Sequence, residues 1–229
     1  MERLKSDFVS TVSHELRTPL AAIYGAAMTL KREDVPLSAD QRDGMLSVVA
    51  GESERLARIV NDILLASRLD SDMVDVSIGR ADPVDLVQTV IAAAQAHLAP
   101  GIELTSDLPE DSPAVAADAD KIRQVLVNLV ENAIKYSPDG GRVSVTLTPS
   151  GERLRFSVID HGLGIPASEH GRIFEKFYRL DPNLTRGVGG TGLGLYICRE
   201  IVRRMDGRIW VESEPGRGST FSFDLPLAG

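Results

Sequence analysis

Hydrophobic positions in the first 70 residues recur at helical spacing. The apolar stripe after Ser38 steps alternately by four and three residues, which is the heptad pattern of helices that pack side by side. Its members are Met45, Val49, Leu56, Ile59, Ile63 and Ala66, with Glu52 as a polar member, and a matching stripe before Glu33 comprises Val9, Leu16, Leu20, Ile23, Ala27 and Leu30. The pattern predicts a helical hairpin with its break at residues 33–38.

A single hairpin has one narrow seam, which is too little core for a stable fold. We therefore expect the open stripe from Met45 to Ala66 to pair with a second copy of the chain. The expected product is a homodimer in which two hairpins form a four-helix bundle.

After Asp70 the pattern changes to shorter elements, which indicates a domain boundary and a flexible connection from Asp70 to Pro83. Helices and strands that alternate in this way favour an α/β sandwich with helices on one face of a sheet. We assign residues 1–72 to the helical domain and residues 73–229 to the sandwich. The expected helices are 83–96, 118–136 and 193–205, and the expected strands are 102–105, 143–147, 154–159, 208–212 and 220–225.

Composition narrows the class of protein. The chain has 229 residues, a formal net charge of -8 and one cysteine, Cys198. A single cysteine excludes an internal disulfide framework and favours a reducing compartment. The acidic balance argues against a nucleic-acid partner, because phosphate backbones need clustered Lys and Arg. No apolar run approaches the roughly 20 residues of a membrane helix. We expect a cytoplasmic location.

His14 is the first candidate for chemistry. Helical geometry places it roughly 150° from the apolar stripe of its segment, so its imidazole should face solvent together with Thr18, one turn later. A neutral imidazole that titrates near pH 6.5 is a competent nucleophile, and Glu15 could orient it or take its proton. The alternative is an ordinary solvated surface histidine.

The second candidate is a helix face. Asn128, Asn132 and Tyr136 recur every fourth residue with Lys135 beside them. Amide oxygens suit Mg²⁺, and an ammonium suits a polyphosphate. A merely polar helix face is the alternative.

Two glycine-rich loops complete the set. Asp160 ends an apolar strand and precedes Gly162 and Gly164, so a flat base could approach the backbone while the carboxylate accepts a hydrogen bond from an exocyclic amine. The second loop, Gly190-Thr191-Gly192-Leu193-Gly194, opens a helix whose free amides would face a phosphate. It also contains a formal G-x-G-x-x-G match that begins at Gly187. The dinucleotide-binding interpretation fails because no strand leads into this loop.

Taken together, these segments closely resemble the transmitter region of bacterial sensor histidine kinases of two-component systems. In that family a dimerisation and phosphoacceptor hairpin precedes a GHKL-type ATPase domain. The resemblance covers nearly the whole chain. Phe8 to Leu20 resembles the H box, Asn128 to Pro138 the N box, Asp160 to Gly164 the G1 box, Ile173 to Arg179 the F box, and Gly190 to Leu195 the G2 box.

The resemblance implies a role for each residue in the phosphoacceptor region. His14 would accept the γ-phosphoryl group of ATP, and Glu15 would be the general base. Thr18 would position a water when the enzyme instead dephosphorylates its partner. Arg179 would reach the γ-phosphate when the domains dock. The partner implied is a response regulator, which receives the phosphoryl group from His14 on an aspartate.

The resemblance likewise implies the cofactor contacts. Asn132 and Asn128 would hold Mg²⁺, Lys135 would meet phosphate, and Tyr136 would lie along the adenine. Asp160 would bind the adenine amine, with Gly162 and Gly164 giving room for the base. The segment from Gly190 to Gly194, with Thr191, Gly192 and Leu193 between them, would close over the phosphates.

Two other classes of function compete with a histidine kinase. An ATPase of the gyrase, chaperone or mismatch-repair branch shares the nucleotide fold but lacks a hairpin with a residue such as His14. The other class is a regulatory module, either a nucleotide-sensing scaffold or a protein that acts mainly as a phosphatase on its regulator. The intact Asn132, Asp160 and loop glycines argue against a scaffold, whereas Thr18 leaves the phosphatase open. The resemblance also implies that the chain is the cytoplasmic core of a larger receptor, with any membrane anchor upstream.

Overall fold

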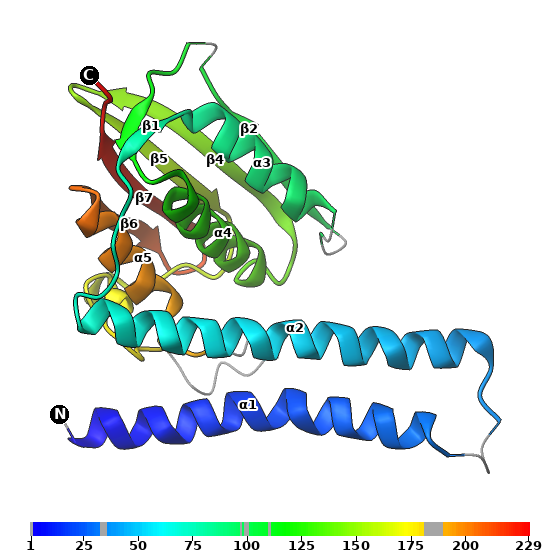
Figure 1. Cartoon of the computed structure of the whole chain (residues 1–229). Coiled ribbons are helices and arrows are strands. Elements are labelled where there is room, and N and C mark those ends of the chain that lie inside the picture. Colours follow the sequence, from blue (N-terminus) through cyan, green and yellow to red (C-terminus); the bar gives the residue numbers. More distant parts are fainter. Residues whose placement is uncertain (1, 33–35, 97, 99–100, 110, 181–189) are drawn as a thin grey trace.

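The computed structural model describes residues 2–32, 36–96, 98, 101–109, 111–180 and 190–229, with side chains described from residue 12 onward. A long helical hairpin lies beneath an α/β domain (Figure 1). The hairpin consists of α1 (Glu2–Leu30) and α2 (Ala39–Asp70). Ser38 caps α2 through a capping box with Gln41, which satisfies amides that the first helical turn leaves unpaired. The predicted hairpin is confirmed.

The seam of the hairpin differs from the predicted one on α1. Leu20 is 59% exposed and Ala27 is also exposed. The row that is buried or half-buried steps by four and three along α1. It shares Leu16, Ile23 and Leu30 with the predicted stripe and has Pro19 and Ala26 in place of Leu20 and Ala27. This row is Val12, Leu16, Pro19, Ile23, Ala26 and Leu30. The α2 stripe from Met45 to Ala66 is buried or half-buried within one chain, so it is not open to a second copy.

The part of the chain that follows α2, called the C-terminal domain below, contains two sheets. The five-stranded sheet has the order β2-β4-β5-β7-β6, in which β2 and β4 are parallel and the other neighbours are antiparallel. Its strands are β2 (Ile102–Asp107), β4 (Gly141–Ser150), β5 (Arg153–Asp160), β6 (Arg208–Glu214) and β7 (Gly218–Pro226). The helices are α3 (Pro83–Gln95), α4 (Ala119–Lys135) and α5 (Gly194–Arg204), with 3-10 turns η1 (Ala167–Glu169) and η2 (Arg172–Phe174).

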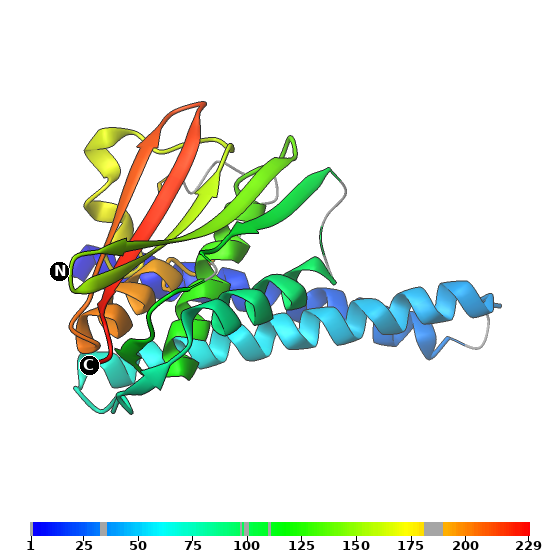
Figure 2. The same cartoon turned by 90° about the horizontal axis from the view of Figure 1, so that it is seen from above.

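The helices cover one face of the five-stranded sheet, as predicted for a sandwich (Figure 2). Alternate residues of the strands point into the layer between sheet and helices. Phe156 of β5 stacks on Phe223 of β7 with ring centroids 4.6 Å apart. Leu126 and Leu129 of α4 are almost completely buried against this layer. The core therefore fixes α4 with its opposite, polar face directed away from the sheet.

Two short strands were not predicted. β1 (Gly79–Ala81) pairs antiparallel with β3 (Val115–Ala117) in a separate small sheet. Three residues are too few to show an alternating pattern, so nothing in the sequence distinguishes them from loop.

The end of α2 is built into the C-terminal domain. Ala66 and Leu69 belong to that domain's buried core. Arg204 of α5 donates to the carbonyl oxygen of Leu69 at 2.8 Å, and the Tyr196 hydroxyl donates to Asp70 at 2.5 Å. Our prediction of a flexible connection from Asp70 is therefore wrong at its start, because these contacts tie Asp70 to α5.

Within the described residues, no helix combines the length and the apolar content that a membrane crossing requires.

Candidate functional site

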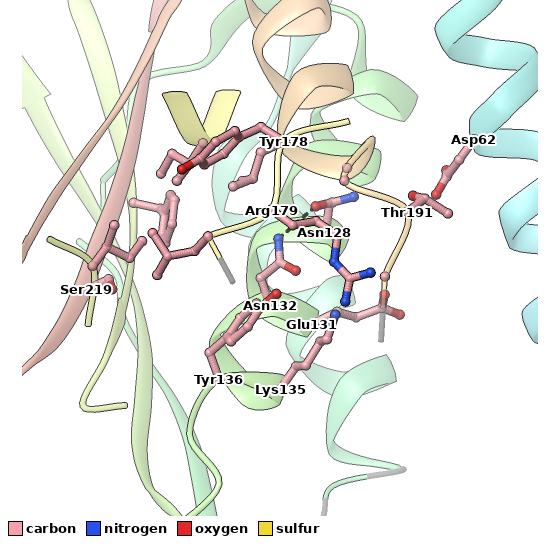
Figure 3. Close-up of a pocket in the computed structure, with 18 of the residues that line it drawn as sticks. Asp62, Asn128, Glu131, Asn132, Lys135, Tyr136, Tyr178, Arg179, Thr191 and Ser219 are labelled. Atoms are coloured by element: carbon pink, nitrogen blue, oxygen red, sulfur yellow. Dashed lines mark hydrogen bonds between the residues drawn. The ribbon is translucent and has the colours of Figure 1, made fainter. Parts of the chain in front are cut away.

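A cavity of about 320 Å³ lies between the hairpin and the C-terminal domain. Figure 3 shows 18 of the residues that line it. The lining comes from α1, α2, α4, the start of α5, the ends of β5 and β7, and the segments on either side of residues 181–189. Most of the predicted site residues line this one cavity. They are Glu15, Asn128, Asn132, Lys135, Tyr136, Asp160, Gly164, Arg179, Gly190, Thr191, Gly192 and Gly194. His14, Thr18, Gly162 and Leu193 are not part of its lining.

The polar face of α4 forms one wall. Asp118 caps this helix through the amides of Asp120 and Lys121, and α4 runs unbroken from Ala119 to Lys135. Asn132 Nδ2 donates to Asn128 Oδ1 at 3.1 Å, and both amides point into the cavity (Figure 3). The amide oxygen of Asn132 accepts no hydrogen bond from a described residue. The amide oxygens of Asn128 and Asn132 fit Mg²⁺ as ligands, because this ion prefers a few protein oxygens together with water and phosphate.

Lys135 and Tyr136 continue the α4 wall. The Lys135 ammonium lies 5.0 Å from the centre of the Tyr136 ring. Burial lowers the pKa of Lys135, and the nearby Arg179 guanidinium lowers it further. Two cations held close together in a partly buried space gain most from a polyanion. The electrostatics of this wall therefore favour a phosphate-bearing ligand.

Asp160 forms the opposite end of the cavity and is only 4% exposed. Its Oδ1 accepts hydrogen bonds from the amides of Gly162 at 2.9 Å and Ser219 at 3.2 Å. Burial raises the pKa of this carboxyl, and the two amides oppose that effect. Since both bonds end on Oδ1, Oδ2 is available to accept a hydrogen bond from a ligand amine.

The two glycines after Asp160 serve the packing of the loop. A Cβ at Gly162 would lie 2.0 Å from the carbonyl oxygen of Tyr136, and a Cβ at Gly164 would lie 1.9 Å from that of Glu214. Gly164 also has a φ of +68°, which side chains rarely adopt. We expected these glycines to give room for the base. Their open sides lie against neighbouring backbone, so they allow the loop to bring Asp160 and Leu163 to the cavity. Gly164 lines the cavity itself, and room for the base stays a prediction.

The segment from Gly190 to Gly194 closes the cavity before α5. A Cβ at Gly194 would come within 2.6 Å of the Asn128 amide, so its absence lets the start of α5 approach α4. The Leu193 side chain is fully buried, and its amide donates to Thr191 Oγ1 at 3.3 Å. No side chain caps the first turn of α5, which leaves helix amides directed at the cavity. The start of the G-x-G-x-x-G match, Gly187, lies outside the described residues.

His14 lies on the exposed face of α1, as predicted, and Thr18 shares that face. The Thr18 hydroxyl donates to the carbonyl oxygen of His14 at 3.3 Å. Glu15 behaves differently, since it is only 6% exposed and projects into the cavity. Its carboxylate lies 3.7 Å from Arg179 of the C-terminal domain. The structure thus brings the neighbour of His14 into the same space as the predicted phosphate-binding residues.

Three polar residues of α2 that line the cavity were not predicted from the sequence, namely Arg55, Arg58 and Asp62. Arg58 pairs with Glu131 of α4 at 3.3 Å. Burial raises the pKa of Asp62 to about 6, and repulsion by Glu131 adds to the effect. The three residues step by three and four along α2, so they form a polar row beside the apolar stripe. That row was the available signal.

Two family models match the chain. Residues 4–72 match the His Kinase A (phospho-acceptor) domain. Residues 117–229 match the histidine kinase-, DNA gyrase B- and HSP90-like ATPase.

Curated relatives and solved structures agree with these matches. Sensor histidine kinase WalK of Bacillus subtilis is 39% identical over 99% of this chain and 37% of its own length. The alginate biosynthesis sensor protein KinB of Pseudomonas aeruginosa is 37% identical over 99% of this chain and 38% of its own length. The chain therefore spans less than half the length of these relatives.

Two crystal structures have a similar fold. Full-length ShkA in complex with AMPPNP is 32% identical with a TM-score of 0.69, over 99% of this chain and 46% of that one. The histidine kinase ThkA in complex with the response regulator TrrA is 26% identical with a TM-score of 0.71, over 99% of this chain and 64% of that one.

Proposed function

The chain belongs to the sensor histidine kinase family, and on this premise we propose that it is an ATP-dependent kinase that phosphorylates itself on His14 and passes the phosphoryl group to an aspartate of a response regulator. One observation carries the proposal. A single cavity contains the α4 amides, Lys135 and Asp160 together with Glu15, which adjoins the exposed imidazole of His14.

The cavity offers a contact for each part of ATP. Asp160 Oδ2 accepts from the exocyclic amine of adenine, and Tyr136 lies along the base. Lys135 and the first amides of α5 bind the phosphates. Asn132 and Asn128 would hold Mg²⁺, and the ion would supply positive charge for the polyphosphate.

In the transfer, an imidazole nitrogen of His14 attacks the γ-phosphorus. The new N–P bond forms as the O–P bond to ADP breaks, and Glu15 receives the proton that the imidazole loses. Arg179 stabilises the charge of the transferring group. Because His14 lies outside the cavity lining here, the C-terminal domain must move relative to α1 before transfer.

The partner proposal rests on exposure. His14 and Thr18 lie side by side on an accessible helix face, where a receiver domain can bring an aspartate to the phosphohistidine. Thr18 can orient a water for the reverse role, dephosphorylation of the regulator. The fold similarity to a kinase in complex with a response regulator supports this partner class.

We also propose a homodimer, but through a different surface from the predicted stripe. Large apolar side chains are exposed along both helices of the hairpin, and burial of such a patch in a second hairpin would stabilise the pair. These residues are Leu20, Tyr24 and Met28 on α1 and Leu46, Val60 and Leu64 on α2.

The assignment of residues 1–72 to the phosphoacceptor domain and of 73–229 to the ATPase domain also remains a proposal, and the matched ranges 4–72 and 117–229 lie within these limits. We place the domains in the cytoplasm, where ATP and a receiver domain are available. An upstream membrane anchor is part of the same proposal.

The test is incubation with γ-labelled ATP and Mg²⁺. The chain should acquire a label that is stable in base and labile in acid, as a phosphoramidate is. His14→Gln should abolish the label, whereas His170→Gln, a change of another histidine outside the cavity, should retain it. Label that persists in His14→Gln would contradict the phosphoacceptor assignment.

A further inference from the structure

Glu15 is held by two arginines that come from different parts of the molecule. Its Oε2 accepts a hydrogen bond from Arg55 Nη2 of α2 at 3.2 Å. Its Oε1 lies 3.7 Å from Arg179 Nη1 of the C-terminal domain. Each oxygen of this nearly buried carboxylate therefore faces a separate guanidinium.

The two arginines differ in what they can do during the reaction. Arg179 belongs to the domain that must move, and it lies in the same cavity as Lys135, where the phosphates of ATP would attract it. Bound phosphates would therefore compete with Glu15 for the Arg179 guanidinium, and the 3.7 Å contact between Arg179 and Glu15 would weaken. Arg55 lies on the same hairpin as Glu15, so the contact between them does not depend on the position of the C-terminal domain.

Arg55 is itself held in place from a third direction. Its Nη1 lies 3.7 Å from Glu52 Oε2, one turn earlier on α2. That oxygen is buried and has no hydrogen-bond partner among the described residues. Arg55 thus bridges the carboxylates of Glu15 and Glu52. Glu52, the polar member of the apolar stripe, helps to hold the Arg55 side chain in the direction of α1.

From these contacts we propose that Arg55 is a positioning residue for autophosphorylation, which keeps the Glu15 carboxylate in place beside His14 when Arg179 leaves it. This inference rests on the proposed role of Glu15 as the general base. A nearly buried carboxylate that loses all of its cation partners is strongly disfavoured where it lies, and it turns toward solvent. That movement takes the proton acceptor away from His14. The ion pair between Arg55 and Glu15 prevents it.

Arg55 also lines the cavity, so direct contact with the nucleotide is the competing role. The two roles predict different kinetics. Loss of a nucleotide contact raises the KM for ATP, whereas loss of a group that acts through the base lowers kcat at nearly constant KM.

The experiment is a double-mutant cycle on the complete chain, measured as the initial rate of labelling over a range of ATP concentrations. Arg55→Gln should lower kcat roughly ten- to a hundredfold, because a general base contributes about 10²–10⁴ to the rate, and the KM should change less than twofold. In a Glu15→Gln background the same change should have no further effect. Arg55→Lys, which keeps a charge, should recover part of the rate.

Arg42→Gln is the matched control, because Arg42 is an exposed arginine near the other end of the same helix; its rate should equal that of the parent. An equal loss from Arg55→Gln in both backgrounds would overturn the proposal and indicate a structural role. A raised KM with unchanged kcat would overturn it in favour of a nucleotide contact. Should Arg55→Gln fail to fold, Arg55→Lys in both backgrounds completes the cycle. A parent chain that acquires no label would instead refute the proposed function.

Discussion

Asp160 acquires its properties from the backbone around it. The amides of Gly162 and Ser219 both donate to Oδ1, which orients the carboxyl of this cavity residue and leaves Oδ2 available to a ligand. Glu15 is fixed in a comparable way by Arg55 and Arg179. In both cases the residue type is visible in the sequence, but the groups that aim it come from elements distant in the chain.

We expect Asp160→Asn to weaken ADP binding about ten- to a hundredfold, since a hydrogen bond to a charged group contributes about 1.5–3 kcal/mol. Affinity of the parent should also fall as the pH drops, because burial raises the pKa of Asp160 and the protonated carboxyl accepts less well. Calorimetric titration with ADP at several pH values measures both effects. Asp107→Asn, at an exposed position of β2, is the control. Unchanged affinity in Asp160→Asn would show that adenine is held by other groups.

Asp62 should make stability depend on pH. Its pKa in the folded chain is about 6, against an ordinary 3.8, so the folded state binds the proton more tightly than the unfolded state. Its destabilising effect therefore grows as the pH rises from about 4 and levels off above 6. Asp62→Asn should stabilise the chain at pH 7.5 by about 1–3 kcal/mol and by less at pH 5. Thermal unfolding at both pH values checks this.

The control for Asp62→Asn is the same change at Asp43, an exposed residue of the same helix. Asp43→Asn should change the melting temperature equally little at both pH values. A melting temperature of Asp62→Asn that differs from the parent by the same amount at pH 5 and pH 7.5 would contradict the shifted carboxyl.

At the scale of elements, the site depends on how closely α4 and α5 approach each other. α4 presents the amides and α5 presents its uncapped first turn, and Gly194 is the residue at which they meet. The apolar face of each helix packs in the buried core, so neither helix can move away from the other without loss of core packing. The position of the polar wall is therefore determined by packing on the opposite side of the same helices.

Gly194→Ala should disturb this contact. Its Cβ would lie within 2.6 Å of Asn128, and relief of such an overlap costs about 1–3 kcal/mol. We expect weaker ADP binding and a lower midpoint of denaturant unfolding. Gly44→Ala, in α2 with nothing near its Cβ, should bind ADP normally and gain up to about 1 kcal/mol of helix stability. Binding by Gly194→Ala equal to that of the parent would mean that Asn128 moves aside at no cost.

The whole molecule is organised by two sets of contacts that the hairpin makes. The end of α2 is part of the core of the C-terminal domain through Ala66 and Leu69. The second set lies earlier in α2. Arg58 pairs with Glu131 of α4, and Arg55 pairs with Glu15 of α1. Movement of the C-terminal domain toward His14 must break polar contacts such as those of Asp70 or bend α2 before its last turn.

The exposed apolar face of the hairpin should mediate dimerisation. Leu64→Glu places a charge in that face and should shift the chain from dimer toward monomer in light scattering at micromolar concentration. Met73→Glu introduces the same charge at an apolar residue that is 69% exposed outside the hairpin, and it should remain dimeric. A parent chain that is already monomeric under these conditions would refute the dimer.

The sequence alone determined the elements and the residue types of the site, because periodicity reports the faces of one element and glycines, caps and polar rows mark its ends. It correctly predicted the bounds of α4 to within one residue at each end, and the exposure of His14. It did not predict β1 and β3, which are too short to show a pattern, and it placed Leu20 and Ala27 in the seam of α1 where the structure has Pro19 and Ala26.

Only the tertiary structure decided which residues meet. Arg55, Arg58 and Asp62 look like a solvated flank of α2 until α1 and the C-terminal domain pack against it. The roles of Gly162 and Gly164 likewise depend on backbone that lies far away in the sequence. The physical reason is that contacts between elements are set by how their apolar faces dock, and docking places polar groups from distant segments in one cavity.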